Sequence, residues 1–456
     1  MQKLGGKLIQ RLAKSKLGSR IANSSFARKL EERFANALRR NRTGNPTCVG
    51  EPVDVATGKV INEGVDFELA GPLPLVWGRV WYSTSAHEGA LGHGWHHAYE
   101  EELYVDVAEE LVIMRLSDGR YAGAELPAMN ESVFIREEKV TLARTARGYE
   151  LHDAAGLSHY FAYVAATESY KLVRLAREAE QAAILFQYTS AGFLERITDS
   201  AGRELTVACD PGGRILSIQA PHPTEVRGQV ELVRYDYNSQ GHLTKVTDAL
   251  DQAWQFRYQG SLLVQATYKN GLSFYYEYDG TDATARCVRT WGDENLYACT
   301  LRYDDDAHQT TVIDSVGARR DYTYDPELGV VTRLLDARGG VMLSEYNEHG
   351  ELLRETDPLG QATRYEYDER GNCTGTARPD GAATQRAYDA QNRLVALTDP
   401  LGGQWQWAYS ETGLLVRRAD PAGQATAYAY ERGQLRTITE ARTQRTTTLT
   451  HDAAGN

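Results

Sequence analysis

The chain has 456 residues, with 50 Lys and Arg against 62 Asp and Glu and a net charge of −12. This length exceeds what one compact core holds and indicates several domains or a repeat array. No run of about 20 apolar residues and no signal-peptide pattern occurs, which excludes a membrane-spanning helix and predicts synthesis in the cytoplasm. The five cysteines are scattered without a Cys-x-x-Cys pair, so we expect free thiols and no zinc site.

Residues 1–45 form a basic head, in which twelve Lys and Arg oppose Glu31 and Glu32 for a net charge of +10. The remaining residues then carry −22. Apolar residues in the head recur at helical spacing and predict two amphipathic helices. They are Leu4, Leu8, Ile9 and Leu12, then Phe26, Leu30, Phe34 and Leu38. Three uses stay open: docking on a secretion spike protein or chaperone, contact with an anionic membrane, or a solvated tail. Nucleic-acid binding is disfavoured because the body is acidic.

Residues 46–179 are predicted to form a β-rich module. It contains one dense group of metal-ligand residue types, His93, His96, His97 and the acids Glu100, Glu101 and Glu102. A strand over residues 94–99 would place His96 and His97 on opposite faces. The helical His-Glu-x-x-His of zinc hydrolases is absent. We therefore expect structural roles for these residues, and no metal or other cofactor.

Residues 180–456 repeat with a period of 21 residues, and the array ends within a repeat. Pro358, Pro379, Pro400 and Pro421 are each 21 residues apart, and the tyrosines keep the same spacing. Strands with alternating polarity connect tight turns, as at residues 404–409, and predict one β-hairpin for each repeat. Acids at so many equivalent turns are turn caps rather than catalytic groups. Two repeats would match one β-propeller blade, but the strict 21-residue period favours single hairpins.

The residues that define the repeat are therefore interpreted as structural, and no catalytic residue is predicted. They are the tyrosines Tyr367, Tyr388, Tyr409 and Tyr430, the acids Asp357, Asp399 and Asp420, the prolines Pro358, Pro379, Pro400 and Pro421, and the glycines Gly360, Gly381, Gly402 and Gly423.

The run Tyr388-Asp-Ala-Gln-Asn-Arg-Leu394, followed by Asp399-Pro-Leu-Gly402, resembles the tyrosine-aspartate (YD) repeats of the Rhs family. Residues 51–58, 67–75, 79–83 and 91–95 are similar to the module that opens Rhs shells. Some members are cut near a Pro-Val-x-x-x-x-Gly-Glu motif. Pro52, Val53 and Gly58 form the corresponding candidate processing motif, with Lys59 in place of the Glu that acts in that cleavage.

This resemblance implies an all-β fold, a spiralling YD-repeat hairpin shell with a β-rich plug module and a short basic helical head. It also implies a container for a C-terminal toxin domain, loaded on a type VI secretion apparatus and used against competing bacteria. The toxin and the closing shell segment would follow residue 456, and the bacterial protein would be secreted without a signal peptide. The alternative is a cell-surface YD-repeat protein that binds carbohydrate or a receptor.

Overall fold

The computed structural model describes residues 47–225, 228–431 and 433–451. These residues form β-strands and two short 3₁₀ helices, η1 (Glu178–Glu180) and η2 (Asp293–Asn295). Within them, no helix is long and apolar enough to cross a membrane. The all-β prediction is therefore confirmed. The predicted helical head, residues 1–45, lies outside the described residues.

The first seven strands form three small antiparallel sheets, with the orders β1-β2, β3-β4-β7 and β5-β6. We call these strands the inner module. They are β1 (Cys48–Val49), β2 (Val53–Asp54), β3 (Ile61–Leu69), β4 (Leu75–Tyr82), β5 (Glu88–Gly89), β6 (Gly92–His93) and β7 (Trp95–His97).

All later strands belong to one antiparallel sheet that closes on itself, which we call the shell. Its first part contains β8 (Glu102–Asp106), β9 (Leu111–Arg115), β10 (Tyr121–Glu125), β11 (Ser132–Ile135), β12 (Val140–Thr145), β13 (Gly148–Asp153), β14 (Ser158–Val164), β15 (Ser169–Arg177), β16 (Ala182–Tyr188), β17 (Leu194–Thr198), β18 (Glu204–Cys209), β19 (Ile215–Pro221), β20 (Gln229–Tyr237), β21 (Leu243–Asp248), β22 (Ala253–Gln259) and β23 (Leu262–Thr267). Its second part contains β24 (Ser273–Tyr278), β25 (Cys287–Gly292), β26 (Cys299–Asp304), β27 (Gln309–Asp314), β28 (Arg319–Asp325), β29 (Val330–Leu335), β30 (Val341–Tyr346), β31 (Leu352–Thr356), β32 (Ala362–Tyr367), β33 (Cys373–Ala377), β34 (Ala383–Tyr388), β35 (Leu394–Thr398), β36 (Gln404–Tyr409), β37 (Leu415–Ala419), β38 (Ala425–Glu431), β39 (Gln434–Glu440) and β40 (Thr446–Thr448).

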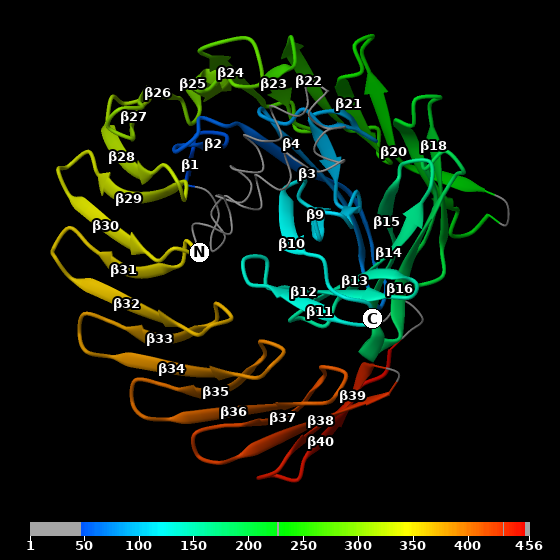
Figure 1. The fold of residues 1–456 in the computed structure, drawn as a ribbon, viewed down its shortest axis with the longest axis vertical. Helices are drawn as coiled ribbons and strands as arrows, with labels where there is room; N and C mark the ends of the chain where they lie inside the picture. The colour runs from blue at the N-terminus through cyan, green and yellow to red at the C-terminus, as the bar shows by residue number, and fades with distance from the viewer. Residues whose placement is uncertain (1–46, 226–227, 432, 452–456) are drawn as a thin grey trace.

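From β11 onward the strands follow one another as hairpins in a single ring (Figure 1). Within the described residues, the strands do not form the separate blades of a propeller. In addition, β8 pairs with both β9 and β15. The division of the chain after residues 45 and 179 stays a prediction, and the sheet continues across the second position because β15 pairs with β16.

The 21-residue repeats form hairpins, and an aspartate caps the turn wherever one opens the Pro-x-Gly segment. Asp399 Oδ1 accepts hydrogen bonds from the backbone N–H groups of Leu401 at 2.9 Å and Gly403 at 2.8 Å. Gly402 has a φ of +83°, a conformation that glycine adopts without strain. Asp357 and Asp420 cap their turns in the same way. These residues therefore act locally, on their own turns.

The repeated tyrosine marks an irregularity in the sheet. The register shifts by one residue immediately before Tyr367, Tyr388, Tyr409 and Tyr430. Bulges of this kind increase local twist and bend a strand. The tyrosine hydroxyl then bonds a carbonyl of the neighbouring strand: Tyr388 to Cys373 at 3.1 Å and Tyr409 to Leu394 at 3.0 Å. Periodic bulges of this kind fit a sheet that curves into a ring.

Replacing Tyr409 with Phe removes this hydroxyl and leaves the ring in place. We expect the free energy of unfolding to fall by about 0.5–1.5 kcal/mol, the net contribution of one such hydrogen bond. Urea denaturation measures the change. The half-exposed Tyr163, replaced in the same way, is the control and should change stability by much less. Equal effects at both positions would contradict a specific role for the Tyr409 hydroxyl.

One face of the shell turns toward the inner module, and only part of that face is covered. Phe256 is 2% exposed and packs on Trp95 with ring centroids 4.9 Å apart. Trp407 holds the equivalent place in its repeat, two residues before the bulge tyrosine, but is only half-buried. Beyond Val330, the one buried hydrophobic side chain among the described residues is Ala419.

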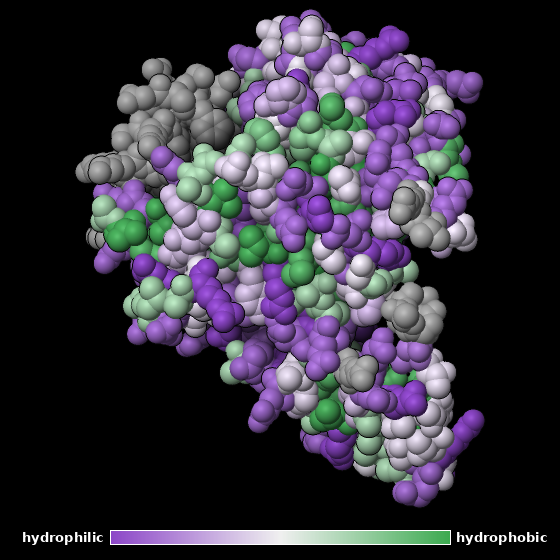
Figure 2. Space-filling model, turned by 90° about the vertical axis from the view of Figure 1, so that its right-hand side faces the viewer, coloured by the Kyte–Doolittle hydropathy of each residue, from purple (hydrophilic) through white to green (hydrophobic). Residues whose placement is uncertain are grey.

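The position of the inner module within the ring agrees with this difference. In Figure 1 the blue strands β1–β4 lie inside the ring beside the green and yellow strands, while the orange hairpins β32–β37 lie across from them. Figure 2 views the side that stands at the right of Figure 1, where hydrophobic residues form small separate groups among hydrophilic ones.

Candidate functional site at the interface of the inner module and the shell

A buried ion pair lies at the centre of the interface. Asp66 in β3 pairs with Arg79 in β4, and both side chains are fully buried. The Tyr235 hydroxyl of β20 donates to Asp66 Oδ2 at 2.6 Å and accepts a hydrogen bond from Trp77 Nε1 at 2.9 Å. Burial lowers the pKa of Arg79 to about 10. These contacts join residues up to 169 positions apart, so they fix the inner module to the shell.

A second chain of hydrogen bonds repeats this arrangement one hairpin further along. Trp95 Nε1 donates to the Tyr258 hydroxyl at 2.9 Å, and that hydroxyl donates to the Leu243 carbonyl at 2.8 Å. At β27, the Thr310 hydroxyl donates to the Val55 carbonyl at 2.6 Å. In this part of the shell, Tyr258 therefore serves both its own repeat and the inner module.

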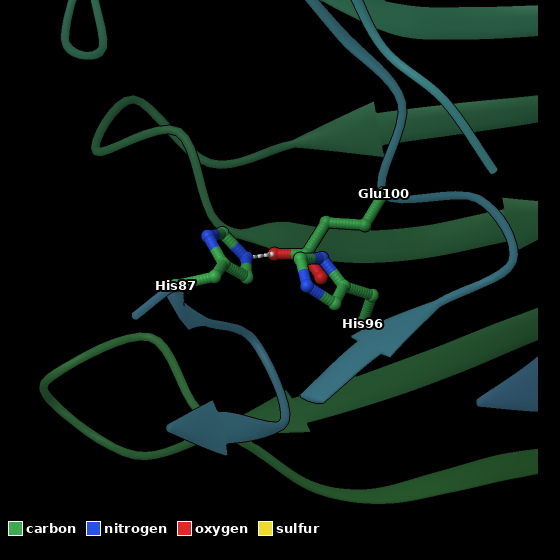
Figure 3. A group of neighbouring side chains, drawn as sticks. All are labelled: His87, His96 and Glu100. Atoms are coloured by element: carbon green, nitrogen blue, oxygen red, sulfur yellow. Dashed lines mark hydrogen bonds and ion pairs between the residues drawn. The ribbon is translucent and has the colours of Figure 1, made fainter. Parts of the chain in front are cut away.

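The densest group of metal-ligand residue types is His87, His96 and Glu100, whose ligand atoms lie within 4.8 Å of one another (Figure 3). His87 Nε2 lies 2.9 Å from Glu100 Oε1. Glu100 Oε2 and His96 Nδ1 are buried and have no hydrogen-bond partner among the described residues, as ligands awaiting an ion would be. A metal site is thus the first hypothesis to test against the geometry.

The geometry disfavours a cation. The His87 and His96 rings are stacked, with centroids 4.5 Å apart and planes only 10° from parallel. Ring nitrogen lone pairs lie in the ring plane, so parallel rings do not direct them to one tetrahedral centre. Arg115 also lies against the group, with one guanidinium nitrogen 2.8 Å from His87 Nε2. Its charge would repel a metal ion at this distance.

Charge balance explains the group without an ion. Arg115 pairs with Glu102 at 2.6 Å and donates to the Glu100 backbone carbonyl at 2.8 Å. Burial alone would raise the pKa of Glu100, but the charges of His87 and Arg115 hold it well below its usual range. Burial and the Arg115 charge lower the pKa of His87. We interpret the group as a structural network that connects the inner module to β8 and β9 of the shell.

The sequence-predicted cluster is divided among several partners. His93 bonds Glu88 at 2.5 Å, Glu101 bonds His159 at 2.8 Å, and His97 stacks on Trp77 with centroids 4.5 Å apart. His96 and His97 follow each other in β7 and face opposite sides, as alternation predicts. Sequence reasoning missed His87 and Arg115, because only the folded chain brings them beside His96.

The candidate processing motif lies in a tight loop. Val53 is fully buried, Gly58 has a φ of +69°, and the Gly58 N–H donates to the Asp54 carbonyl at 2.8 Å. Lys59 is buried, with its ammonium 3.3 Å from the centroid of the Tyr82 ring. Processing at Pro52, Val53 and Gly58 stays a prediction.

A brace connects early and late parts of the shell. Arg136, in the turn between β11 and β12, donates to both carboxylate oxygens of Glu351 at 3.1 and 2.9 Å. Beside it, the Arg370 guanidinium lies 3.8 Å from the centroid of the Phe134 ring. Gly433, after β38, lies so close to Glu180 of η1 that no larger residue fits. Early strands of the shell thus contact the turns after β30, β32 and β38.

Replacing Arg136 with Ala leaves the carboxylate of Glu351 buried without its cation. We expect a loss of about 1–3 kcal/mol in the stability of this contact. Hydrogen exchange of the amides in residues 347–351 should become at least tenfold faster, while turn 399–403 stays unchanged as the internal control. Arg136→Lys keeps the charge but loses the bidentate hydrogen bond. Its exchange rate should lie between those of the wild type and of Arg136→Ala. Unchanged exchange in Arg136→Ala would refute the brace.

Comparisons with known proteins match three family models to four stretches of this chain. A model described as Domain of unknown function (DUF6531) matches residues 50–123. The Teneurin YD-shell model matches residues 173–294, and the RHS Repeat model matches residues 346–383 and 388–425. The chain is an Rhs-family YD-repeat protein. The predicted YD repeats and hairpin shell are thereby confirmed.

The names of curated relatives state different activities. The "Probable deoxyribonuclease RhsB" of Dickeya dadantii is 27% identical over 313 residues, which are 68% of this chain and 21% of the relative. The "Toxin protein Tse5" of Pseudomonas aeruginosa is 28% identical over 353 residues, 68% of this chain and 26% of that protein. The "Double-stranded DNA deaminase toxin A" of Burkholderia cenocepacia is 27% identical over 286 residues, which are 61% of this chain and 20% of that protein.

The chain spans about a quarter or less of the length of these relatives. The relatives share the shell region with this chain. The name of one relative states a deoxyribonuclease activity and the name of another states a deaminase activity. The family models matched here are repeat and shell modules, which are structural. The different activities of the relatives therefore point to parts outside the shared region.

Proposed function

We propose that this chain is the structural shell that encapsulates and carries a C-terminal toxin domain of the same polypeptide. The observation that carries the proposal is the similarity to toxin proteins of differing named activity, confined to shell sequence. The half-buried inner face of the late hairpins supports it. This is the face that packs on the inner module elsewhere in the shell. Here its side chains are partly exposed, at Leu397, Trp405, Trp407 and Tyr428.

The delivery route forms the finer part of the proposal. One relative is named a toxin protein and another a deaminase toxin, both bacterial. We propose type VI or contact-dependent delivery between competing bacteria, after synthesis in the cytoplasm and without a signal peptide. The proposed partners are the toxin domain and the closing shell segment, with a secretion spike protein or chaperone at residues 1–45. We expect no nucleic-acid partner and no role for membrane contact.

Protease protection tests the proposal on the complete polypeptide that contains this chain. A domain enclosed by the shell should resist trypsin at least tenfold longer than the same domain produced alone. Trp405→Ala with Trp407→Ala removes two aromatic side chains of the inner face and should shorten the protection. A matched pair on the outer face, Gln404→Ala with Gln406→Ala, should not. Equal digestion of the attached and isolated domains would refute encapsulation.

A further inference from the structure

A polar pocket lies across strands β20 to β23 on the outer face of the shell, which is turned away from the inner module. In β22, Phe256 points inward and packs on Trp95. Its neighbours Gln255 and Arg257 therefore point outward. These strands belong to the upper right part of the ring in Figure 1. The pocket has a volume of about 330 Å³, and its lining also includes the polar residues Asp236, Lys245, Gln265 and Thr267.

The two cations of this pocket are without an ion-pair partner. Among the described residues, Lys245 and Arg257 form no side-chain hydrogen bond and no salt bridge. Lys245 pairs with Gln255, two residues before Arg257, so the two cations are diagonal neighbours. Such neighbours lie about 7–8 Å apart, which lets two long side chains reach one anion. Asp236 is the one acid of the lining, so its charges sum to +1, whereas residues 46–456 together carry −22.

Two aromatic side chains extend the outer face beside this pocket. Phe274 and Tyr276 in β24 are buried toward the inside of the ring, so Tyr275 between them points outward. Tyr275 pairs with Gln265 of the pocket on one side and with Trp291 of β25 on the other. The rings of Tyr275 and Trp291 stack, with centroids 5.4 Å apart and planes 18° from parallel. The aromatic pair thus begins one strand beyond the pocket.

This pair departs from the pattern of the repeat. From β16 onward, every other aromatic residue on a described strand occupies an inner-face position, as Trp407 does. Both rings of the pair are only half-buried. The Tyr275 hydroxyl donates to Asp293 at 3.0 Å, and the Arg289 guanidinium lies 4.4 Å from the centroid of the Trp291 ring. Within the described chain, only Trp291 stacks on Tyr275. A fixed, partly open aromatic surface therefore lies at the end of the pocket.

We propose that the pocket and the aromatic pair form a binding site for an acidic oligosaccharide. The C–H face of a sugar ring packs well on an aromatic ring, whose face carries partial negative charge. The Gln255 amide both donates and accepts hydrogen bonds, as sugar hydroxyls require. Lys245 and Arg257 bind a carboxylate of the sugar through charge-assisted hydrogen bonds. Four strand spacings separate Lys245 from Trp291, about 19 Å in all, which accommodates a short oligosaccharide. The inference goes beyond the carrier function and does not depend on it.

The acids around the site disfavour nucleic acid as its ligand. Aromatic rings and cations also bind single-stranded nucleic acid. Here, however, Asp236 lines the pocket, and Asp293 and Glu277 lie beside the aromatic pair. A strand with a phosphate at every nucleotide would meet these carboxylates. A sugar with one carboxylate can place that group between Lys245 and Arg257 alone.

Isothermal titration calorimetry of the full chain with defined trisaccharides tests the site. The probes are trigalacturonate and trisialic acid, which carry carboxylates, and maltotriose, which carries none. We expect saturable binding of at least one carboxylated probe, and binding of maltotriose at least tenfold weaker. The double variant Lys245→Met, Arg257→Met should weaken binding of the carboxylated probe at least tenfold. Added salt should weaken its binding to the unmodified chain.

A matched pair of glutamines separates the site from the general surface of the repeat. Gln255→Ala should weaken binding about fivefold through the loss of one hydrogen bond. Gln406→Ala changes the same residue type at the equivalent exposed position of a later repeat and should leave binding unchanged. Tyr275→Ala should abolish binding and also lower stability, because it removes the hydrogen bond to Asp293. The variants at Lys245, Arg257 and Gln255 should keep the melting temperature, since these side chains have no partner in the described chain.

Three results would overturn the proposal. They are no saturable binding of either carboxylated probe, equally strong binding of maltotriose, and unchanged affinity in the double variant. Binding of a single-stranded oligo-dT in the absence of binding to any trisaccharide would assign the site to nucleic acid, and it also overturns the proposal.

Discussion

Replacing Asp66 with Ala is expected to lower the free energy of unfolding by about 3–5 kcal/mol, the cost of leaving one partner of a buried ion pair unpaired. The change strands the Arg79 guanidinium, which is fully buried, and removes the acceptor of the Tyr235 hydroxyl. The hydrogen bond from Trp77 to Tyr235 then no longer continues to a carboxylate. We therefore expect the inner module to loosen from β20 before the shell unfolds.

The effect is measured by urea denaturation followed through fluorescence of the buried Trp77, Trp81 and Trp95. The matched control is the double variant Asp66→Ala, Arg79→Met, which removes both charges and should recover most of the loss. If the single variant costs less than about 1 kcal/mol, the ion pair is not the centre of the interface.

Acid should weaken the protein through His97. Burial lowers the pKa of His97 to about 4. The unfolded chain takes up this proton near pH 6.5, whereas the folded chain takes it up only near pH 4. The stability that depends on neutral His97 is thus fully present above pH 6.5. It is lost as the pH falls toward 4, by an amount on the order of 3 kcal/mol.

A His97→Asn variant separates this contribution from that of the carboxylates. The Asn amide oxygen can replace the Nδ1 atom that accepts the Tyr99 N–H at 3.3 Å, but it does not titrate. Unfolding free energies at pH 7, 6, 5 and 4 should therefore fall less steeply in the variant than in the wild type. Parallel curves would show that His97 does not bring about the acid sensitivity.

The sequence predicted what is local in this fold. The 21-residue period placed a turn at Asp399 and a strand through Trp405 and Trp407, because an Asp-Pro-x-Gly turn and period-two alternation act within a few residues. The same repeat led to the Rhs resemblance that the family models confirm. The order of the hairpins from β11 onward needed no long-range information, since each of these strands pairs with the next.

The contacts that make the interface were not predictable in this way. Asp66 meets Tyr235 across 169 residues, and Arg136 meets Glu351 across 215. No period links such residues, and their identities are ordinary in a β-protein. The histidine cluster shows the same limit: proximity in sequence suggested His93 and His97, while folding placed His87 and Arg115 beside His96.

An electron cryomicroscopy map of the complete polypeptide tests the central claim most directly. We expect a further domain enclosed by the ring, with density against the face that carries Trp405, Trp407 and Tyr428. A map in which that face meets only solvent, with any further domain outside the ring, would contradict it.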